Sequence, residues 1–171
     1  MKTLIPIFLF FLISCETNRT QTKVEIIEVF DSAYGYQFGF PSDFSETKEN
    51  LGLFNQFTFE SPNEEAKLIY FIDEVNEIQD LNQYLSELKS GVNTPFPELK
   101  FSKVEFNKEK NGFTAHGNMG QNEVLYKAFV SQQSVFVGTV YVKTMVFIYP
   151  KQKRKHYEPL GISIAEKFRD Y

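Results

Sequence analysis

Alternation of aromatic residues with small or polar ones predicts strands in the first half of the chain. In segment 34–40 an aromatic residue stands at every second position, with glycine or glutamine between. Segments 24–30 and 53–59 alternate in a similar way, and segment 66–75 is a strongly apolar run. A period of two is typical of a strand that buries one face. The sequence therefore predicts four strands in this half, separated by runs of turn residues.

The spacing of apolar residues changes at two places, and each change predicts a helix. In segment 77–90 these residues fall three or four positions apart, which puts them on one helix face. Asn76 is expected to cap the start of this helix, and Gly91 is expected to end it. Segment 156–168 has the same spacing, with Pro159 expected in the first turn, where a missing N–H costs nothing. The apolar positions are Ile78, Leu81, Leu85 and Leu88 in the first helix, and Tyr157, Leu160, Ile164 and Phe168 in the second.

Further alternating runs predict strands between the two helices. Segments 101–106 and 112–117 are expected to pair as a hairpin, because an Asn-Gly dipeptide lies in the connection between them. Segments 124–130 and 135–149 predict two more strands. The polar run Ser131–Ser134 is expected to form the turn between these two strands.

The order of strands, helix, strands and helix excludes the regular alternation of a parallel α/β fold. It indicates an α+β domain with a mainly antiparallel sheet and two principal helices. The strand at 135–149 is long, and residues 142–144 are where it would bend or break. Residues 24–171 show no internal repeat or linker and are enough for one domain with its own core. We therefore predict a single domain at 24–171.

The chain begins with the features of a bacterial export leader. Lys2 precedes a largely apolar run at residues 4–13, which is too short to cross a bilayer and has the length of a signal-peptide core. The residues Leu12-Ile13-Ser14-Cys15 resemble the lipobox of bacterial lipoproteins, with an aliphatic residue three before the cysteine and a small one just before it. This resemblance implies cleavage before Cys15 and attachment of fatty acyl chains such as palmitate to Cys15.

The leader divides the chain into three parts. Residues 1–14 form the signal peptide, residues 15–23 a polar, lipidated tether, and residues 24–171 the folded domain. Cys15 is the only cysteine, so the mature domain has no disulfide and no thiol for catalysis or metal binding. Two alternatives stay open: an ordinary secretory peptide whose cysteine stands there by chance, and an uncleaved membrane helix. The polar residues 16–19 disfavour the membrane helix.

Composition and charge narrow the classes of partner. Aromatic residues make up 16% of the chain, although tryptophan is absent, and this favours a substantial sheet. The net charge of −4 becomes −5 once the leader is removed with Lys2, which argues against nucleic acid as a partner. The expected partners are the membrane, through the lipid anchor, and a protein or a small apolar ligand.

Two segments resemble the PsbP-like family of α/β/α sandwich domains. The aromatic strand that runs into a proline turn at 36–44 is similar to the family's early strand, and 157–168 is similar to its closing helix. The chain has Phe44 where many relatives carry tryptophan, and Lys167 where a serine is common. The resemblance implies a PsbP-like α/β/α sandwich and a role in binding or assembly rather than in catalysis. It supplies no catalytic residue.

Candidate chemistry is sparse along the chain. The two histidines, His116 and His156, lie outside any metal-binding spacing, so no metal and no cofactor are expected. A hydrolase could use His116 as a base with Ser131 or Ser134 as the nucleophile, but the chain has no Gly-x-Ser-x-Gly motif. A polar residue at a strand end is the simpler interpretation of His116.

Three further groups of residues have both a functional and a structural interpretation. Asp73, Glu74 and Glu77 could bind a cation, although acids at a helix start commonly complement its dipole. The basic run from Lys151 to Lys155 could touch anionic lipid headgroups or lie in a solvated loop. The two aromatic and apolar rows could line a pocket or fill the core; these rows are Tyr34/Tyr36/Phe38/Phe40 and Phe136/Val140/Val142.

Together these observations predict an envelope lipoprotein that is anchored to a bacterial membrane and faces the periplasm or the cell surface. Its domain is expected to act as a non-catalytic binding or assembly module. A small-molecule or lipid-binding lipoprotein is the first alternative, favoured by a deep apolar cavity between sheet and helix. A hydrolase that uses His116 is the second.

Overall fold

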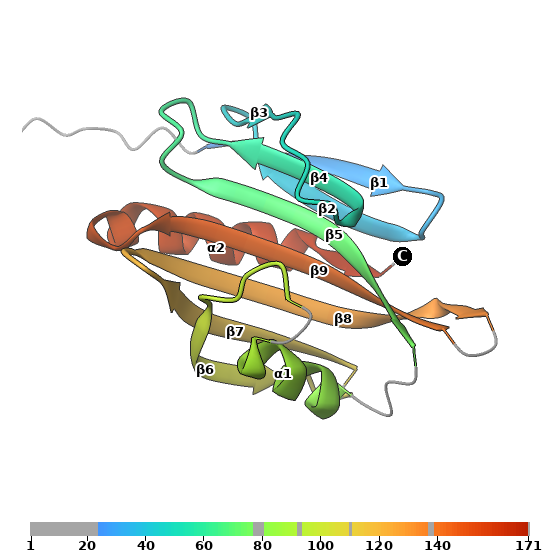
Figure 1. Ribbon diagram of the computed structural model, residues 1–171. Helices are drawn as coiled ribbons and strands as arrows, with labels where there is room; N and C mark the ends of the chain where they lie inside the picture. Colours follow the sequence, from blue (N-terminus) through green and yellow to red (C-terminus); the bar gives the residue numbers. More distant parts are fainter. Residues whose placement is uncertain (1–23, 77–80, 92–93, 110, 137–138, 171) are drawn as a thin grey trace, which may run out of the picture.

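A seven-stranded antiparallel sheet forms the centre of the molecule, with its strands in the order β3-β4-β5-β9-β8-β7-β6 (Figure 1). The computed structural model describes residues 24–76, 81–91, 94–109, 111–136 and 139–170, with the backbone alone for 75–76, 131–136 and 139–140. The strands of this sheet are β3 (Ser45–Glu46), β4 (Phe54–Glu60), β5 (Lys67–Asn76), β6 (Lys100–Phe106), β7 (Gly112–Met119), β8 (Asn122–Phe136) and β9 (Thr139–Pro150).

A second, three-stranded sheet with the order β1-β2-β10 packs on one face of the first. The hairpin of β1 (Ile26–Asp31) and β2 (Tyr36–Pro41) is joined by the two-residue strand β10 (Arg169–Asp170). Because β10 pairs with the start of β2, the end of the chain lies beside its first hairpin. This closure positions the candidate site described below.

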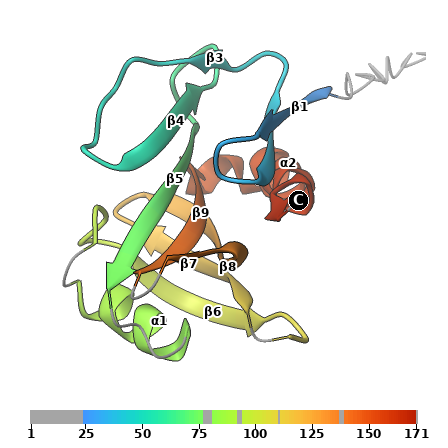
Figure 2. The ribbon, with the colours of Figure 1, turned by 90° about the vertical axis from the view of Figure 1, so that its right-hand side faces the viewer.

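The two helices lie on opposite sides of the large sheet (Figure 2). Helix α2 (Arg154–Lys167) follows the 3₁₀ turn η1 (Lys151–Lys153) and shares its side with the three-stranded sheet. Helix α1 (Leu81–Ser90) covers the other side. Gly161 lets α2 approach closely, because a Cβ there would lie only 2.7 Å from the ring of Phe147.

Each face of the sheet has its own hydrophobic core, because side chains alternate along each strand. Phe147 packs with α2 and the three-stranded sheet, whereas its neighbour Val146 packs with α1. The α2 face buries the aromatic row of β2, since Tyr36 and Phe38 have almost no exposed surface. The predicted α+β fold with a mainly antiparallel sheet and two principal helices is confirmed.

The core on the α1 face contains a polar network around a buried tyrosine. The Tyr84 hydroxyl donates to Asp73, lies 3.1 Å from the Tyr126 hydroxyl and 3.5 Å from Thr144 Oγ1. Burial raises the pKa of the Asp73 carboxyl, and the hydrogen bond from Tyr84 partly opposes this rise. These polar groups therefore satisfy one another between α1 and the sheet.

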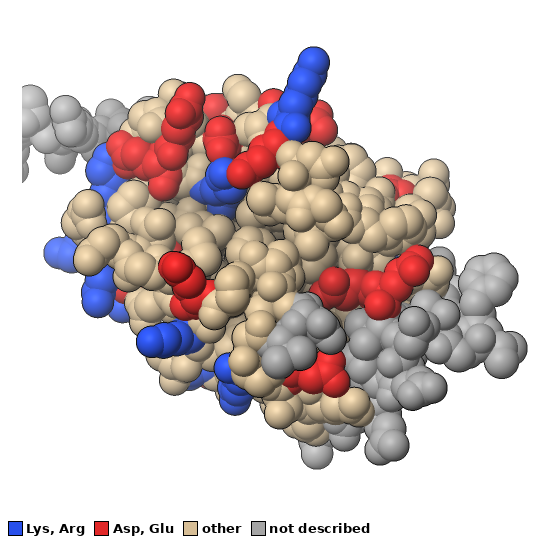
Figure 3. All heavy atoms as spheres, in the orientation of Figure 1, with Lys and Arg blue, Asp and Glu red and all other residues tan. Residues whose placement is uncertain are grey.

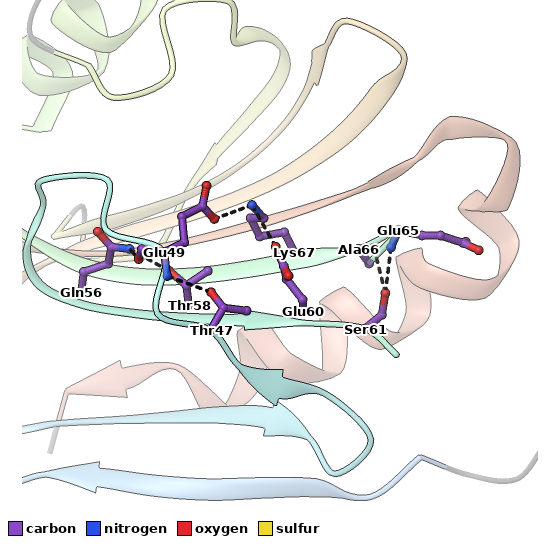
Figure 4. A network of polar contacts seen from close by, with 9 residues as sticks. All are labelled: Thr47, Glu49, Gln56, Thr58, Glu60, Ser61, Glu65, Ala66 and Lys67. Atoms are coloured by element: carbon purple, nitrogen blue, oxygen red, sulfur yellow. Dashed lines mark hydrogen bonds and ion pairs between the residues drawn. The ribbon is translucent and has the colours of Figure 1, made fainter. Parts of the chain in front are cut away.

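The edge of the large sheet at β4 is covered by its own loop (Figure 4). The Gln56 amide donates to the Glu49 carbonyl and to Thr58 Oγ1, and Lys67 pairs with both Glu49 and Glu60. At the next turn, Ser61 Oγ accepts the backbone N–H groups of residues 65 and 66. These contacts leave less of the β4 edge free to pair with another strand.

Three local predictions are wrong. The polar run Ser131–Ser134 does not form a turn, because β8 continues through it to Phe136 with a register shift that absorbs the additional residues. Residues 142–144 do not break β9 and are fully buried, since each finds a place in one of the two cores. Pro159 lies in the second turn of α2 rather than the first, because the helix already begins at Arg154.

Other predictions fall partly or wholly outside the described residues. The signal peptide, Cys15 and the tether at 15–23 lie there, as does Glu77. Asn76 closes strand β5, so its predicted capping role depends on residues 77–80, which are not described. Gly91 ends α1 as expected, with φ +72° and its N–H on the Leu88 carbonyl. Within the described part of the chain, no helix combines the length and the apolar character that crossing a membrane requires.

Candidate functional site

The segment after α2 forms one wall of the candidate site. Phe168 leaves the helix in an extended conformation and is completely buried, with its ring against Tyr36, Tyr70 and Phe129. The ring fixes the segment that follows it, so that β10 can pair with β2. The two polar residues of β10, Arg169 and Asp170, are thereby held on the α2 side of the sheet.

Lys127 connects strand β8 to the end of α2. Its ammonium donates to the carbonyls of Ala165 and Phe168, both at 2.7 Å. A cation at this position gives the carbonyls at the helix end a donor, in addition to the Phe168 N–H on Ala165, and complements the negative end of the helix dipole. Burial lowers the pKa of Lys127, and the nearby carboxylate of Glu166 opposes part of that effect.

A cavity of about 640 Å³ opens beside Lys127, which is within the size range of small-ligand pockets. It lies between the C-terminal segment at 168–170, the middle of β8 and the turn that joins β6 to β7. Phe129 and Thr114 contribute to its lining. A Cβ at Gly112 would come within 3.0 Å of the Ala128 carbonyl oxygen and of the Phe129 Cβ, so glycine lets β7 approach β8 closely at this wall of the cavity.

A second lysine, Lys143, lies entirely inside the protein next to this cavity. Its ammonium pairs with Asp170 at 2.6 Å, donates to the Gly35 carbonyl at 3.1 Å and faces the rings of Tyr36 and Phe129. Cation and carboxylate compensate each other where neither is well hydrated. Lys143 therefore connects the central strand β9 with the turn of the first hairpin and with the end of the chain.

Neither lysine was predicted from the sequence as a site residue. Lys127 and Lys143 stand in otherwise apolar strands, and the second was assigned to a break in β9. A charged residue at a position that alternation assigns to the core was the available signal. The partners of the two lysines could not be identified, because Gly35, Ala165 and Asp170 are distant from them in the sequence.

His116 lies on the α2 face of β7, where its main chain pairs with Lys103 and Leu125. The residue is partly buried, and its backbone carbonyl accepts the hydroxyl of Ser102 at 3.1 Å. Its charge makes a small contribution to lowering the pKa values of Glu105 and Glu158, after the larger effects of Lys103 and Arg154. The side chains of Ser131 and Ser134 are outside the described part, so the predicted nucleophiles are not placed.

The predicted acidic cluster is divided between two environments. Asp73 is held by Tyr84 in the core of the α1 face, while Glu74 is exposed. In the ranges that the structure describes, no group of three histidine, cysteine or acidic residues could hold a metal ion.

The basic run lies at the start of α2, at the left edge of the surface in Figure 3. Two of its residues are compensated by acids: Lys153 pairs with Glu65, and Arg154 pairs with Glu123 and Glu158. These partners reduce the positive charge available to lipid headgroups. A groove of about 790 Å³ begins here and separates the start of β1 from α2.

No protein-family model matches the sequence, and no curated protein matches it either. Solved structures do resemble it. The solution structure of cyanobacterial PsbP (CyanoP) from Synechocystis sp. PCC 6803 has a TM-score of 0.63 and 13% identity, covering 86% of this chain and 94% of CyanoP. The fold described above is therefore PsbP-like.

Two further structures share this fold. LpqN of Mycobacterium tuberculosis, which is involved in cell envelope biogenesis, has a TM-score of 0.52 and 15% identity, covering 85% of this chain and 90% of LpqN. The Ran-binding protein Mog1p of Saccharomyces cerevisiae has a TM-score of 0.51 and 11% identity, covering 86% of this chain and 96% of Mog1p. At such identities the likeness extends to the fold alone.

Proposed function

We propose that this chain is a lipid-anchored protein of the bacterial cell envelope whose PsbP-like domain binds a partner without catalysing a reaction. The lipobox-like residues ending at Cys15 support the anchor. Two structural neighbours, of which one is a Ran-binding protein and the other is involved in cell envelope biogenesis, are compatible with such a role. The cavity beside Lys127 is the proposed binding site.

One observation carries this proposal: the cavity shares no lining residue with the groove at the start of the domain. Val24 and Ile26 line that groove together with α2, from Lys155 to Lys167. The cavity lies beyond the end of α2 and is lined by residues 168–170, by β8 and by the turn between β6 and β7. A domain tethered through Val24 can therefore leave this cavity open to a partner.

The anchor is tested by metabolic labelling with a palmitate analogue in a bacterial host. The wild-type chain should incorporate label, and its mature N-terminus should be residue 15 by mass spectrometry. The variant Cys15→Ala should incorporate none, since the acceptor thiol is absent. Label on the variant, or a mature N-terminus elsewhere, would contradict the anchor.

The binding role is tested by site-specific photocrosslinking in intact cells. A photoreactive residue at Glu109, on the cavity rim, should capture a reproducible partner, whereas one at Lys151, near the start of α2, should not. Both positions are exposed, so they form a matched pair. Equal capture at both positions, or none at Glu109, argues against the cavity end as the binding surface.

The non-catalytic part is tested with His116→Ala. Because His116 is the base on which the hydrolase alternative depends, the variant should keep the full in vivo function of the wild-type chain. Loss of that function with an unchanged melting temperature would favour the hydrolase.

A further inference from the structure

The cavity beside Lys127 combines an ammonium group with aromatic walls. Lys127 supplies the charge, and Phe129 on the same strand and the exposed Phe106 at the end of β6 supply apolar surface, with the buried Phe168 ring behind Phe129. The rings of Phe129 and Phe168 contact each other with their centroids 4.8 Å apart. A ligand that enters here meets a hydrogen-bond donor on one side and apolar surface on the other.

The charge of Lys127 is not compensated by an ion pair with any described residue, in contrast to two of the acids around the cavity. Glu105 pairs with Lys103 at 2.7 Å, and Asp170 pairs with Lys143 at 2.6 Å. Lys127 instead donates to two neutral carbonyls. An ammonium group has three donor hydrogens, so one remains for a further acceptor.

We propose that this cavity binds a small carboxylate-bearing amphiphile, with the carboxylate on the Lys127 ammonium and the apolar part against Phe129 and Phe106. A charge-assisted hydrogen bond formed away from bulk water is stronger than a neutral one, so the anion is favoured over an uncharged ligand of equal shape. This inference deepens the binding role proposed above and does not depend on the lipid anchor.

The test compares 1-naphthaleneacetate with its neutral analogue 1-naphthaleneacetamide on the full chain in nanodiscs of zwitterionic lipid. The chain has no tryptophan, so the naphthalene fluorescence can be followed directly during titration. The acid should bind about tenfold or more tightly than the amide, because only the acid forms a charged pair with Lys127. Equal affinities, or no binding of either compound, would overturn the proposal.

Two variants locate the effect. Lys127→Met keeps an apolar stem without the charge and should bind the acid and the amide with about equal affinity. Lys127→Arg should restore most of the preference for the acid. Lys89→Met is the matched control, because this exposed lysine lies on α1, on the other side of the sheet from the cavity, and its loss should leave the preference unchanged. A preference that survives in Lys127→Met, or disappears in the control, contradicts the assignment.

A pH series on the wild-type chain keeps the test independent of any folding defect in the variants. The preference for the acid should fall as the pH rises through the lowered pKa of Lys127 and should be constant at lower pH. Carboxylates and guanidinium groups do not titrate between about pH 7 and about pH 11. The other charged groups facing this region are Glu105, Glu109, Lys143, Glu166, Arg169 and Asp170. A preference that is unchanged above about pH 10.4, the ordinary pKa of a lysine, would overturn the role of Lys127.

A negative result here can be separated from failure of the proposed function. The labelling experiment tests the anchor and the crosslinking experiment tests the binding surface, and neither uses this class of ligand. A partner captured at Glu109 together with equal affinities for acid and amide would keep the binding role and reject the amphiphile.

Discussion

The two faces of the central sheet bury different polar groups, although adjacent residues of one strand supply both. On β9, Lys143 points to the α2 face and pairs with Asp170, whereas Thr144 points to the α1 face and joins the network around Tyr84. The network on the α1 face consists of hydroxyls and one carboxyl. The α2 face contains two lysines together with buried tyrosines and Glu123.

The difference shows which face is suited to exchange with a ligand. On the α1 face, each polar group of the Tyr84 network is satisfied by another within the same core. On the α2 face, Lys127 donates to carbonyls at the end of α2, and Lys143 donates to the carbonyl of Gly35 in the turn of the first hairpin. A cavity lies beside the two lysines. The four predictions that follow test this contrast.

The largest effect is expected for Lys143→Met on the α2 face. Removing the cation leaves Asp170 and the Gly35 carbonyl without their buried partner, which should lower the free energy of unfolding by about 3 kcal/mol. Urea denaturation of the variant and the wild-type chain measures the loss. The double variant Lys143→Met/Asp170→Asn should recover part of it, and a loss below about 1 kcal/mol would contradict the role of this pair.

A smaller loss is expected for Gly161→Ala, which tests how closely α2 approaches the sheet. The added methyl group would meet the Phe147 ring at 2.7 Å, so overpacking should cost about 1–2 kcal/mol despite the better helix propensity of alanine. Ser86→Ala, on the exposed side of α1, is the control and should be neutral or slightly stabilising. Equal melting temperatures for Gly161→Ala and the wild-type chain would be inconsistent with this close contact.

On the α1 face, Tyr84→Phe removes the hydroxyl that joins Asp73, Tyr126 and Thr144 while keeping the ring in place. The free energy of unfolding should fall by about 1 kcal/mol, because the Asp73 carboxyl loses the hydrogen bond that the Tyr84 hydroxyl donates. Thermal unfolding provides the measurement. A loss as large as that of Lys143→Met would show that the two faces do not differ in the way described.

The smallest effect, with the opposite sign, is expected for Asp73→Asn. The folded-state pKa of Asp73 is raised, so the folded chain binds its proton more tightly than the unfolded chain does. The contribution of Asp73 to stability therefore falls as the pH rises from about 4 through the raised value. The variant should lack this fall and be about 0.5 kcal/mol more stable than the wild-type chain at pH 7. Urea titrations at several pH values measure both quantities, and a wild-type profile without this component would reject the interpretation.

Local patterns in the sequence were sufficient to predict most elements and the fold class. Alternation located β2 and β4, and the spacing of leucines located α1, because each signal arises from burial of one side of one element. The polar run Ser131–Ser134 was misassigned because a bulge inside a long strand has the same composition as a turn. The depth at which Lys143 is buried depends on strands far away in the sequence.

The candidate site was much harder to predict than the fold. His116 and the basic run from Lys151 to Lys155 were identified by residue type alone, and the structure places the acids Glu65, Glu123 and Glu158 beside the basic run. Lys127 was not identified, because its importance comes from the helix carbonyls that it meets after folding. Residue chemistry is visible in a sequence, whereas the contacts that give it a role are created by the tertiary structure.

The pairing of β10 with β2 sets a limit on the order of folding. The contact between Arg169 and Gln37 joins residues 132 positions apart in the chain. During synthesis the first hairpin emerges early, but its third strand and the partner of Lys143 are made more than about 130 residues later. A nascent chain stalled before Phe168 would therefore leave β2 without β10 and Lys143 without Asp170.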